Sequence, residues 1–224
     1  MVGGLGTRLR PYTQVIPKPL LPIGEQCSLD INLKKLNESG VEEVILAVNY
    51  KSEIFESYCG DGSKYGLTIS YSKEKEPLGT SGPLSLLKDQ LTEDFIVING
   101  DVITDLNFSD LMKFHKKHNA DITVVTKDFN FPLAYGVIKT DGDRVVHLEE
   151  KSNIKAEIIA GIYAISPRVL ADLPSGFSLM TDFIREHIKG KVLHYKLEGY
   201  WLDIGQTKDY EQAQADAAKG IFDR

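Results

Sequence analysis

The chain has 224 residues, 42% of them hydrophobic and 26% charged, so its composition is that of a globular protein and excludes a disordered one. A formal net charge of −6 at pH 7, without any basic run, argues against non-specific binding to nucleic acid. No apolar run reaches the roughly 18 residues that span a bilayer, no apolar signal-peptide core opens the chain, and two cysteines are too few for a disulfide scaffold. We therefore expect one cytoplasmic α/β domain over residues 1–224, with both cysteines reduced and no contact with nucleic acid or membrane.

The first half alternates short apolar runs with segments of helical period. Strands are expected at 44–48, 67–71, 95–98 and 122–125. Helices are expected at about 28–39, 51–58, 80–90 and 109–118. Gly40 is the expected glycine cap of the first helix, and Ser109 is the expected N-cap of the last. The alternation predicts a Rossmann-like, doubly wound sheet that is mixed but mainly parallel, with helices on both faces.

The second half predicts a small antiparallel patch on this sheet. Three neighbouring strands are expected at 134–139, 144–149 and 157–165. Asp141-Gly142-Asp143 indicates a hairpin turn between the first two of them. A helix at 178–188, a strand at 192–197 and a terminal helix at 207–219 complete the chain. No internal repeat or long linker divides it, which favours a single compact domain.

A glycine-rich stretch, Gly3-Gly-Leu-Gly-Thr-Arg-Leu-Arg-Pro11, opens the chain. Glycines let backbone N–H groups approach an anion closely, and Arg8 adds positive charge. The dinucleotide-binding motif is excluded because Leu9 stands where its third glycine would be, and the Walker motif is excluded because no Gly-Lys-Ser/Thr follows. An ordinary glycine turn remains the alternative. A short distance on, the prolines of Pro17-Lys-Pro-Leu-Leu-Pro22 hold Lys18 on a stiff backbone.

Together these two segments resemble the sugar-phosphate nucleotidylyltransferases, a family similar to mannose-1-phosphate guanylyltransferases and glucose-1-phosphate thymidylyltransferases. Further motifs follow in the family's order at Pro77–Gly82, Asn99–Asp101, Tyr135–Val137, Glu150–Lys151, Gly161–Tyr163 and Tyr200–Gly205. The resemblance covers nearly the whole chain, and its last motif is most similar to the guanylyltransferase branch. It implies Mg²⁺-dependent, in-line transfer of a nucleotidyl group from GTP to mannose 1-phosphate, with release of pyrophosphate.

The resemblance also implies a role for individual residues. Arg8 would contact the triphosphate and the leaving pyrophosphate, and Lys18 would hold the α-phosphate and the sugar phosphate together. Asp101, which is also catalytic, and Asp203 would bind Mg²⁺. The nucleotide would contact Gly3, Gly4, Gly6, Thr7, Gly79 and Thr80. The sugar phosphate would contact Tyr135, Gly136, Glu150 and Lys151, which makes the antiparallel patch the sugar-binding part. Without the resemblance, Arg8 would be interpreted as a surface arginine and Lys18 as a turn lysine. Asp101 and Asp203 would be interpreted as turn or helix-capping residues.

The chain departs from the family pattern in ways that leave alternatives open. Only Met1 and Val2 remain of the family's first apolar strand, so we expect a fragment of a longer chain. Ile159 stands where the family usually has Asn, and a polar contact to the sugar is absent as a result. Uridylyl or thymidylyl transfer to glucose 1-phosphate is one alternative, and a non-catalytic nucleotide- or sugar-phosphate-binding regulatory homologue is another. A homo-oligomer and upstream regulatory domains of the CBS type also stay open.

Overall fold

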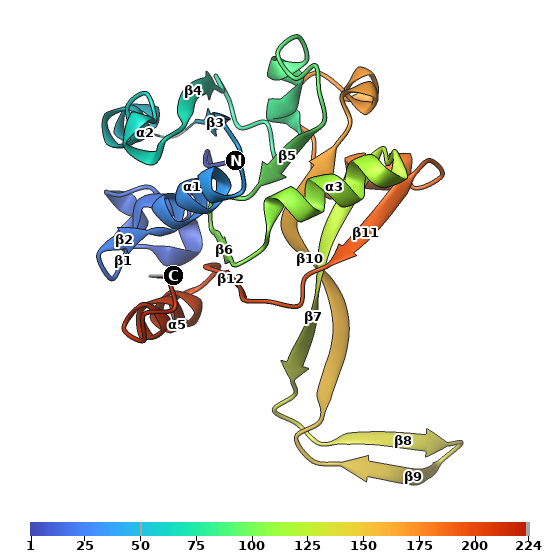
Figure 1. Ribbon diagram of the computed structural model, residues 1–224. Coiled ribbons are helices and arrows are strands. Elements are labelled where there is room, and N and C mark those ends of the chain that lie inside the picture. Colours follow the sequence, from blue (N-terminus) through green and yellow to red (C-terminus); the bar gives the residue numbers. More distant parts are fainter. Residues whose placement is uncertain (50, 223–224) are drawn as a thin grey trace.

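The computed structural model describes residues 1–49 and 51–222. Its largest sheet has the strand order β11–β7–β10–β5 (Figure 1). The bounds are Phe95–Ile98 for β5, Ile122–Pro132 for β7, Asn153–Ile165 for β10 and Val192–Lys196 for β11. Strand β11 is parallel to β7, and β10 is antiparallel to both β7 and β5, so three of the four strands share one direction. The expected mixed sheet is confirmed, and of its pairings the one between β7 and β11 is parallel.

Helices cover both faces of this sheet, because side chains of alternating positions on a strand point to opposite faces. Ile162 of β10 packs with Leu111 of helix α3 (Phe108–His118), and the next residue, Tyr163, packs with Phe183 of helix α4 (Met180–His187). The N-cap of α3 is Asn107, whose side chain accepts from the backbone N–H of Asp110. The prediction of Ser109 as N-cap is therefore wrong, because the helix begins earlier.

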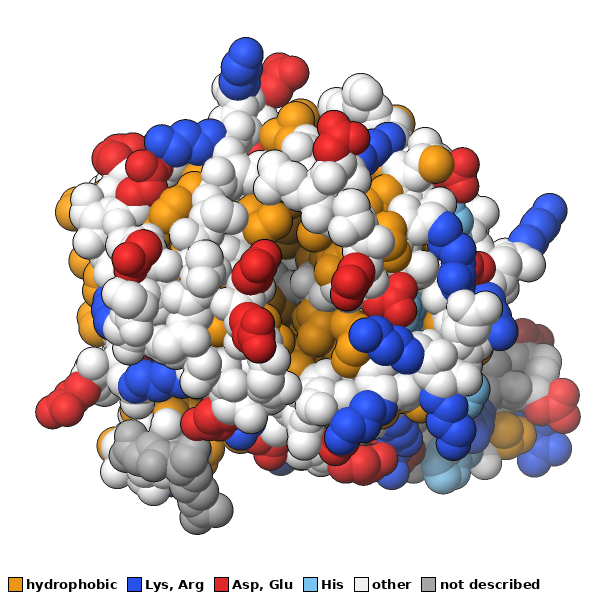
Figure 2. All heavy atoms as spheres, turned by 45° about the horizontal axis from the view of Figure 1, so that its top comes forward, with side chains coloured by type: hydrophobic (Ala, Val, Ile, Leu, Met, Phe, Trp, Pro, Cys, Tyr) orange, Lys and Arg blue, Asp and Glu red, His pale blue; other side chains and the backbone are white. Residues whose placement is uncertain are grey.

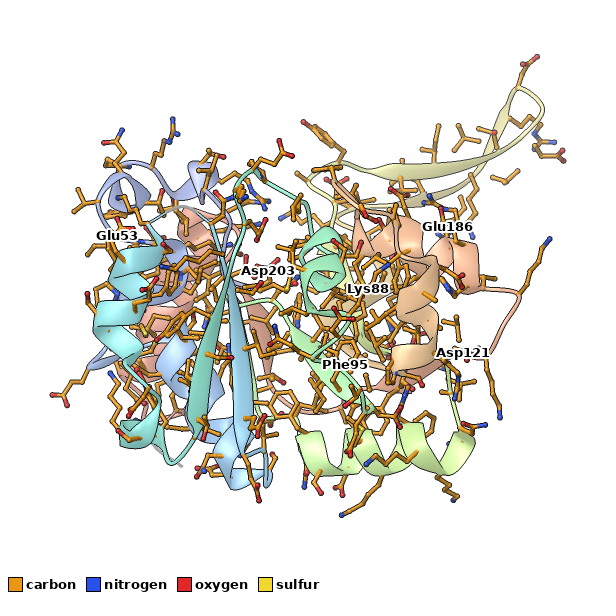
Figure 3. All side chains as sticks on the ribbon, turned by 90° about the horizontal axis from the view of Figure 1, so that it is seen from above. Glu53, Lys88, Phe95, Asp121, Glu186 and Asp203 are labelled. Atoms are coloured by element: carbon orange, nitrogen blue, oxygen red, sulfur yellow. The ribbon has the colours of Figure 1, made fainter. Side chains whose placement is uncertain are left out.

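A second, two-stranded parallel sheet pairs β3 (Glu43–Val48) with β4 (Thr68–Lys73). Helices α1 (Ser28–Glu38) and α2 (Ser52–Cys59) have the expected positions, and they share an apolar core with these strands. Gly40 has a φ of +82°, a left-handed conformation in which glycine carries no Cβ penalty, so its role as a cap is confirmed. This sheet and the larger one form the two halves of the body (Figure 3).

Met1 and Val2 lie between the two halves. The N–H of Val2 donates to the carbonyl of Ala47, next to the end of β3, and the N–H of Gly100, which follows β5, donates to the carbonyl of Met1. Beside these two residues is a cavity of about 310 Å³, lined largely by hydrophobic side chains of α1, β3 and β5. Figure 2 shows a hollow lined by hydrophobic side chains on this face of the molecule.

Beyond the sheet, β7 and β10 continue as a two-stranded ribbon that projects from the body (Figure 1). The ribbon ends in a hairpin of β8 (Val137–Asp141) and β9 (Arg144–Glu149), with Gly142 at a positive φ in the turn, so the expected hairpin is confirmed. The third expected strand, 157–165, is not a neighbour of this hairpin in the sheet, so that part of the expectation is wrong. Strand β10 pairs with β5 and β7, because its apolar half belongs to the core of the larger sheet.

The remaining elements are short apart from the last helix. Strand β6 (Val102–Thr104) pairs with β12 (Trp201–Asp203), β1 (Pro22–Ile23) pairs with β2 (Gln26–Cys27), and α5 (Thr207–Ala217) is the last helix. The 3₁₀ segments are η1 (Thr7–Leu9), η2 (Tyr12–Gln14), η3 (Lys18–Leu20), η4 (Ser63–Tyr65), η5 (Gly82–Leu87) and η6 (Pro167–Asp172). The α-helix expected at 80–90 is wrong, because the 3₁₀ segment η5 stands there instead. None of the described helices is long and apolar enough to cross a membrane.

Candidate functional site

The glycine-rich stretch lines a cavity of about 480 Å³. The predicted catalytic residues also line this cavity, namely Arg8, Lys18 and Asp101. It also contains all of the predicted nucleotide-binding residues, namely Gly3, Gly4, Gly6, Thr7, Gly79 and Thr80. The fold therefore brings together, in one concave site, segments that are far apart in the sequence.

The glycine-rich loop is held by local hydrogen bonds and by one core residue. Gly6 has a φ of +60°, and its carbonyl accepts from the Leu9 N–H at 3.0 Å and from the Thr13 hydroxyl at 2.8 Å. A Cβ on Gly6 would lie 2.9 Å from Cγ2 of Thr13, closer than packed carbon atoms come. Leu9 is 1% exposed in an apolar cluster with Ile103, so it anchors the loop while Arg8 stays exposed.

Lys18 lies between two aspartates. Its Nζ donates to Oδ2 of Asp101 at 2.5 Å and lies 3.9 Å from Oδ1 of Asp203, and its side chain is only 10% exposed. The two carboxylates meet because β12 pairs with β6: Asp203 stands opposite Val102, and the N–H of Ile204 donates to the carbonyl of Asp101. Figure 3 shows Asp203 between the two halves of the body. The sequence-predicted pair of carboxylates is thus brought together.

The electrostatics around Asp203 favour a further positive charge. Burial raises the pKa of Asp203, the negative charge of Asp101 raises it further, and Lys18 and Arg8 oppose the rise. The side chain is 45% exposed as a whole, but its Oδ1 is buried and finds no hydrogen-bond partner among the described residues. Two close carboxylates with an unpartnered oxygen fit a hard divalent cation such as Mg²⁺. The described residues offer no group of three or more metal-binding side chains, so phosphates and water would complete the coordination.

Gly79 and Thr80 connect the cavity to the larger half of the body. Gly79 has a φ of +83° and pairs with Ser178, and a Cβ there would overlap the carbonyl oxygen of Ser178. The Thr80 hydroxyl accepts from the N–H of Met180, the first residue of α4. Phe177, which is 66% exposed, lines the cavity beside this loop. The loop is therefore held in place by the segment that leads into α4.

Asn49 and Glu74 are polar cavity residues outside the sequence motifs, and neither was predicted as a site residue. Asn49 follows β3 directly, and Glu74 follows β4 directly, and both line the cavity. The signal that could have identified them is their place at the carboxyl ends of two parallel strands, where such sheets bind ligands. Neither residue belongs to a glycine-rich or proline-rich motif, so neither stands out in the sequence.

The predicted sugar-phosphate residues lie elsewhere. Tyr135 and Gly136 connect β7 to β8, and Glu150 and Lys151 connect β9 to β10, at the junction of ribbon and hairpin. A Cβ on Gly136 would lie 3.5 Å from Oε2 of Glu150, so the two segments adjoin each other. Tyr135 is 81% exposed, and none of the four residues lines the cavity. The structure brings these residues to one another but not to Arg8 and Lys18.

Several known proteins are similar to this chain in sequence or in structure. Mannose-1-phosphate guanyltransferase from Yarrowia lipolytica is 41% identical over 220 residues, which are 94% of this chain and 61% of that protein. The crystal structure of HddC from Yersinia pseudotuberculosis is similar with a TM-score of 0.78 and 27% identity, covering 96% of each chain. A putative glucose-1-phosphate thymidylyltransferase from Bacillus anthracis shares the fold, with a TM-score of 0.81 and 23% identity over 96% of this chain and 92% of that one.

The chain spans about three fifths of the length of the curated relatives that it matches. Residues 1–220, which include every predicted site residue, match the family described as "Nucleotidyl transferase". The chain therefore belongs to the nucleotidyl transferase family.

Proposed function

We propose that this chain transfers a guanylyl group from GTP to mannose 1-phosphate and releases pyrophosphate. The observation that carries the proposal is the convergence of Arg8, Lys18 and Asp101 on one cavity beside the glycine-rich loop. Asp203 lies next to this group, because its Oδ1 is 3.9 Å from Nζ of Lys18. The name of the relatives that are about 40% identical, mannose-1-phosphate guanyltransferase, supports this base and this sugar. Uridylyl or thymidylyl transfer to glucose 1-phosphate remains the alternative within the same chemistry.

The chemical difficulty is that one phosphate oxygen has to attack the phosphorus of another polyanion. Positioning and neutralisation of charge supply most of the catalysis of such reactions. Arg8 and the N–H groups of the glycine-rich loop would hold the leaving pyrophosphate. Lys18, fixed by Asp101, would hold the attacking oxygen and the α-phosphate in line. No covalent intermediate on the protein is needed.

Asp101 and Asp203 would hold Mg²⁺ in this proposal. The bound ion would neutralise charge on the triphosphate. The raised pKa of Asp203 and its unpartnered Oδ1 support this assignment, because a cation relieves both the repulsion from Asp101 and the unsatisfied oxygen.

The sugar would be bound from the ribbon. Glu150 would accept hydrogen bonds from sugar hydroxyls, Lys151 would contact the phosphate, and Gly136 beside Glu150 would leave room for the ring. Since these residues do not line the cavity, the proposal requires the ribbon to bend toward Arg8 and Lys18 when the sugar phosphate binds.

The experiment is pyrophosphate release from GTP, UTP, dTTP, CTP and ATP, each with mannose, glucose or heptose 1-phosphate. We expect release with GTP and mannose 1-phosphate, and its loss when EDTA removes Mg²⁺. Preference for another pair of nucleotide and sugar 1-phosphate would change the proposed substrates but not the proposed reaction. Intact nucleotide binding without release from any pair would contradict the enzymatic proposal and favour a regulatory homologue.

The expectation of a first apolar strand before Met1 also stays a prediction. The apolar cavity between β3 and β5 supports it, because an extended apolar segment continuing from Met1 would pair with both strands. Placing such a segment before Met1 should raise the midpoint of thermal unfolding, and an unchanged midpoint would contradict the prediction.

A cytoplasmic location is supported by Cys27 and Cys59, which are both buried and unpaired.

A further inference from the structure

Phe177 is an exposed aromatic residue that the proposed reaction does not use. It lies between η6 and α4, its side chain is 66% exposed, and it lines the same cavity as the glycine-rich loop. Of the large hydrophobic residues that are exposed in the described part of the chain, only Phe177 and Leu5 line this cavity. Covering such a side chain with an uncharged ligand group removes apolar area from water, which favours binding.

The backbone on the far side of the ring holds Phe177 at the cavity. The N–H of Ser178 donates to the carbonyl of Leu78 at 2.9 Å, and the carbonyl of Ser178 accepts from the N–H of Ser81 at 3.0 Å. The hydroxyl of Ser81 donates to the hydroxyl of Ser178 at 2.8 Å. A Cβ on Gly79 would lie 3.3 Å from Cε2 of Phe177. The ring is therefore fixed directly beside Gly79, a predicted nucleotide contact.

The chemistry of a phenyl ring limits which part of a ligand can cover it. The ring has no charge and no hydrogen-bonding group, so a phosphate placed on it would lose its hydration without compensation. Arg8, Lys18 and Asp101 line the same cavity and supply the polar groups that phosphates and a cation need. The flat face of a nucleobase, in contrast, stacks favourably on an aromatic side chain, whichever base it is.

The sugar phosphate is the other ligand of the proposed reaction, and its predicted contacts do not line this cavity. The nucleotide contacts do, and one of them adjoins the ring. We propose that Phe177 stacks on the base of the bound nucleotide and contributes affinity without selecting one base. This inference rests on the proposed function, which names a nucleoside triphosphate as the ligand.

The test measures the binding of GTP, UTP and tripolyphosphate, each with Mg²⁺, by calorimetry. Leucine keeps an apolar side chain but removes the ring, so Phe177→Leu should bind GTP and UTP each about 10-fold more weakly than the unaltered chain does. The ratio of the two affinities should not change, because stacking does not read the hydrogen-bonding edge of a base. Tripolyphosphate, which has no base, should bind equally to both proteins. Phe177→Trp, which has an aromatic ring, should keep the affinity for both nucleotides.

A fluorescence measurement separates stacking on the base from contact with the ribose. The emission of the new tryptophan in Phe177→Trp should fall when GTP binds, because a stacked guanine quenches an indole. Tripolyphosphate should leave this emission unchanged. The unaltered chain, in which Trp201 is the one tryptophan, gives the baseline. Unquenched emission from a protein saturated with GTP would overturn the inference.

Phe131→Leu is the matched control, because Phe131 is also exposed, at 43%, but lies on β7 and does not line the cavity. It should leave the affinities for GTP and UTP unchanged. The inference would be overturned by an unchanged affinity of Phe177→Leu for GTP, or by an equal loss of affinity for tripolyphosphate. A higher KM for the sugar phosphate with unchanged nucleotide affinity would also overturn it, because the ring would then face the sugar.

Pyrophosphate release is measured separately on the same proteins. Absence of release from the unaltered chain, together with the expected loss of nucleotide affinity in Phe177→Leu, would contradict the proposed function and leave the role of Phe177 supported. Release from the unaltered chain with unchanged nucleotide affinity in Phe177→Leu would support the proposed function and overturn this inference.

Discussion

The predicted site residues of the body and of the ribbon differ in how far they are exposed to solvent. In the body, Lys18 is 10% exposed and lies between Asp101 and Asp203, whose positions are set by a strand pairing. In the hairpin at the end of the ribbon, every residue of β9 is exposed, and Tyr135 at the junction is 81% exposed. A two-stranded hairpin is marginally stable by itself. Lys18 and the two aspartates are therefore held rigidly, whereas the predicted sugar-binding residues stand on a part of the molecule that can move.

The largest effect should come from Asp101→Asn. This change removes the ion pair that fixes Lys18 and one of the two proposed Mg²⁺ ligands. We expect pyrophosphate release to fall about 1000-fold or more, with unfolding still cooperative. Asp143→Asn, in the exposed hairpin turn, is the control from the ribbon and should keep full activity. Full activity of Asp101→Asn would refute the metal assignment.

A smaller loss is expected for Arg8→Lys. The lysine keeps the charge but cannot form the paired N–H contacts that a guanidinium makes with phosphate oxygens. Pyrophosphate release should fall about 100-fold, mainly in kcat. Arg10→Lys is the matched control, because Arg10 is also exposed in the same loop but does not line the cavity. Equal losses in both variants would show that the effect is not specific to Arg8, and full activity of Arg8→Lys would show that the position needs only positive charge.

The ribbon should affect only the sugar substrate. Glu150→Gln should raise the KM for the sugar phosphate about 10-fold and leave the KM for the nucleotide unchanged, because Glu150 lies outside the nucleotide cavity. Glu149→Gln, at the neighbouring exposed position at the end of β9, is the control. A change in the KM for the nucleotide would contradict the separation between body and ribbon.

The smallest effect concerns His115, which is 1% exposed on α3 and bonds through Nδ1 to the Thr123 hydroxyl at 2.8 Å. Burial lowers the pKa of His115, and the nearby Asp94 only partly offsets this. As pH falls below about 6.5, the unfolded chain takes up this proton before the folded one does, so the free energy of unfolding should decrease. One proton contributes at most about 1.4 kcal/mol per pH unit.

Urea unfolding between pH 5 and 8 measures the slope of the free energy of unfolding against pH. His115→Gln should flatten it, whereas His147→Gln, at an exposed position of the hairpin, should leave it unchanged. An identical slope in the original chain and in His115→Gln would show that other groups cause the pH dependence.

Local patterns were enough to locate most elements. The β-branched run at 95–98 is a strand with those bounds, and the Asp141–Asp143 turn closes the expected hairpin. The pattern was insufficient at 80–90, where apolar spacing indicated an α-helix and the chain forms a 3₁₀ segment. It was also insufficient for β10, because periodicity shows that a strand is buried but not which strands it pairs with. The site residues of the glycine-rich loop were predictable because their motif is contiguous.

The sequence by itself determined the glycine-rich loop, the stiff Lys18 segment and the alternation of strands and helices, since backbone conformation and hydrophobic period act over a few residues. Tertiary structure alone decided that Asp203 lies beside Asp101, that Glu74 and Asn49 line the same cavity as the glycine-rich loop, and that the predicted sugar-binding residues stand apart on a ribbon. These facts depend on strand pairing between distant segments. Such pairing is decided by the burial of whole faces in a common core.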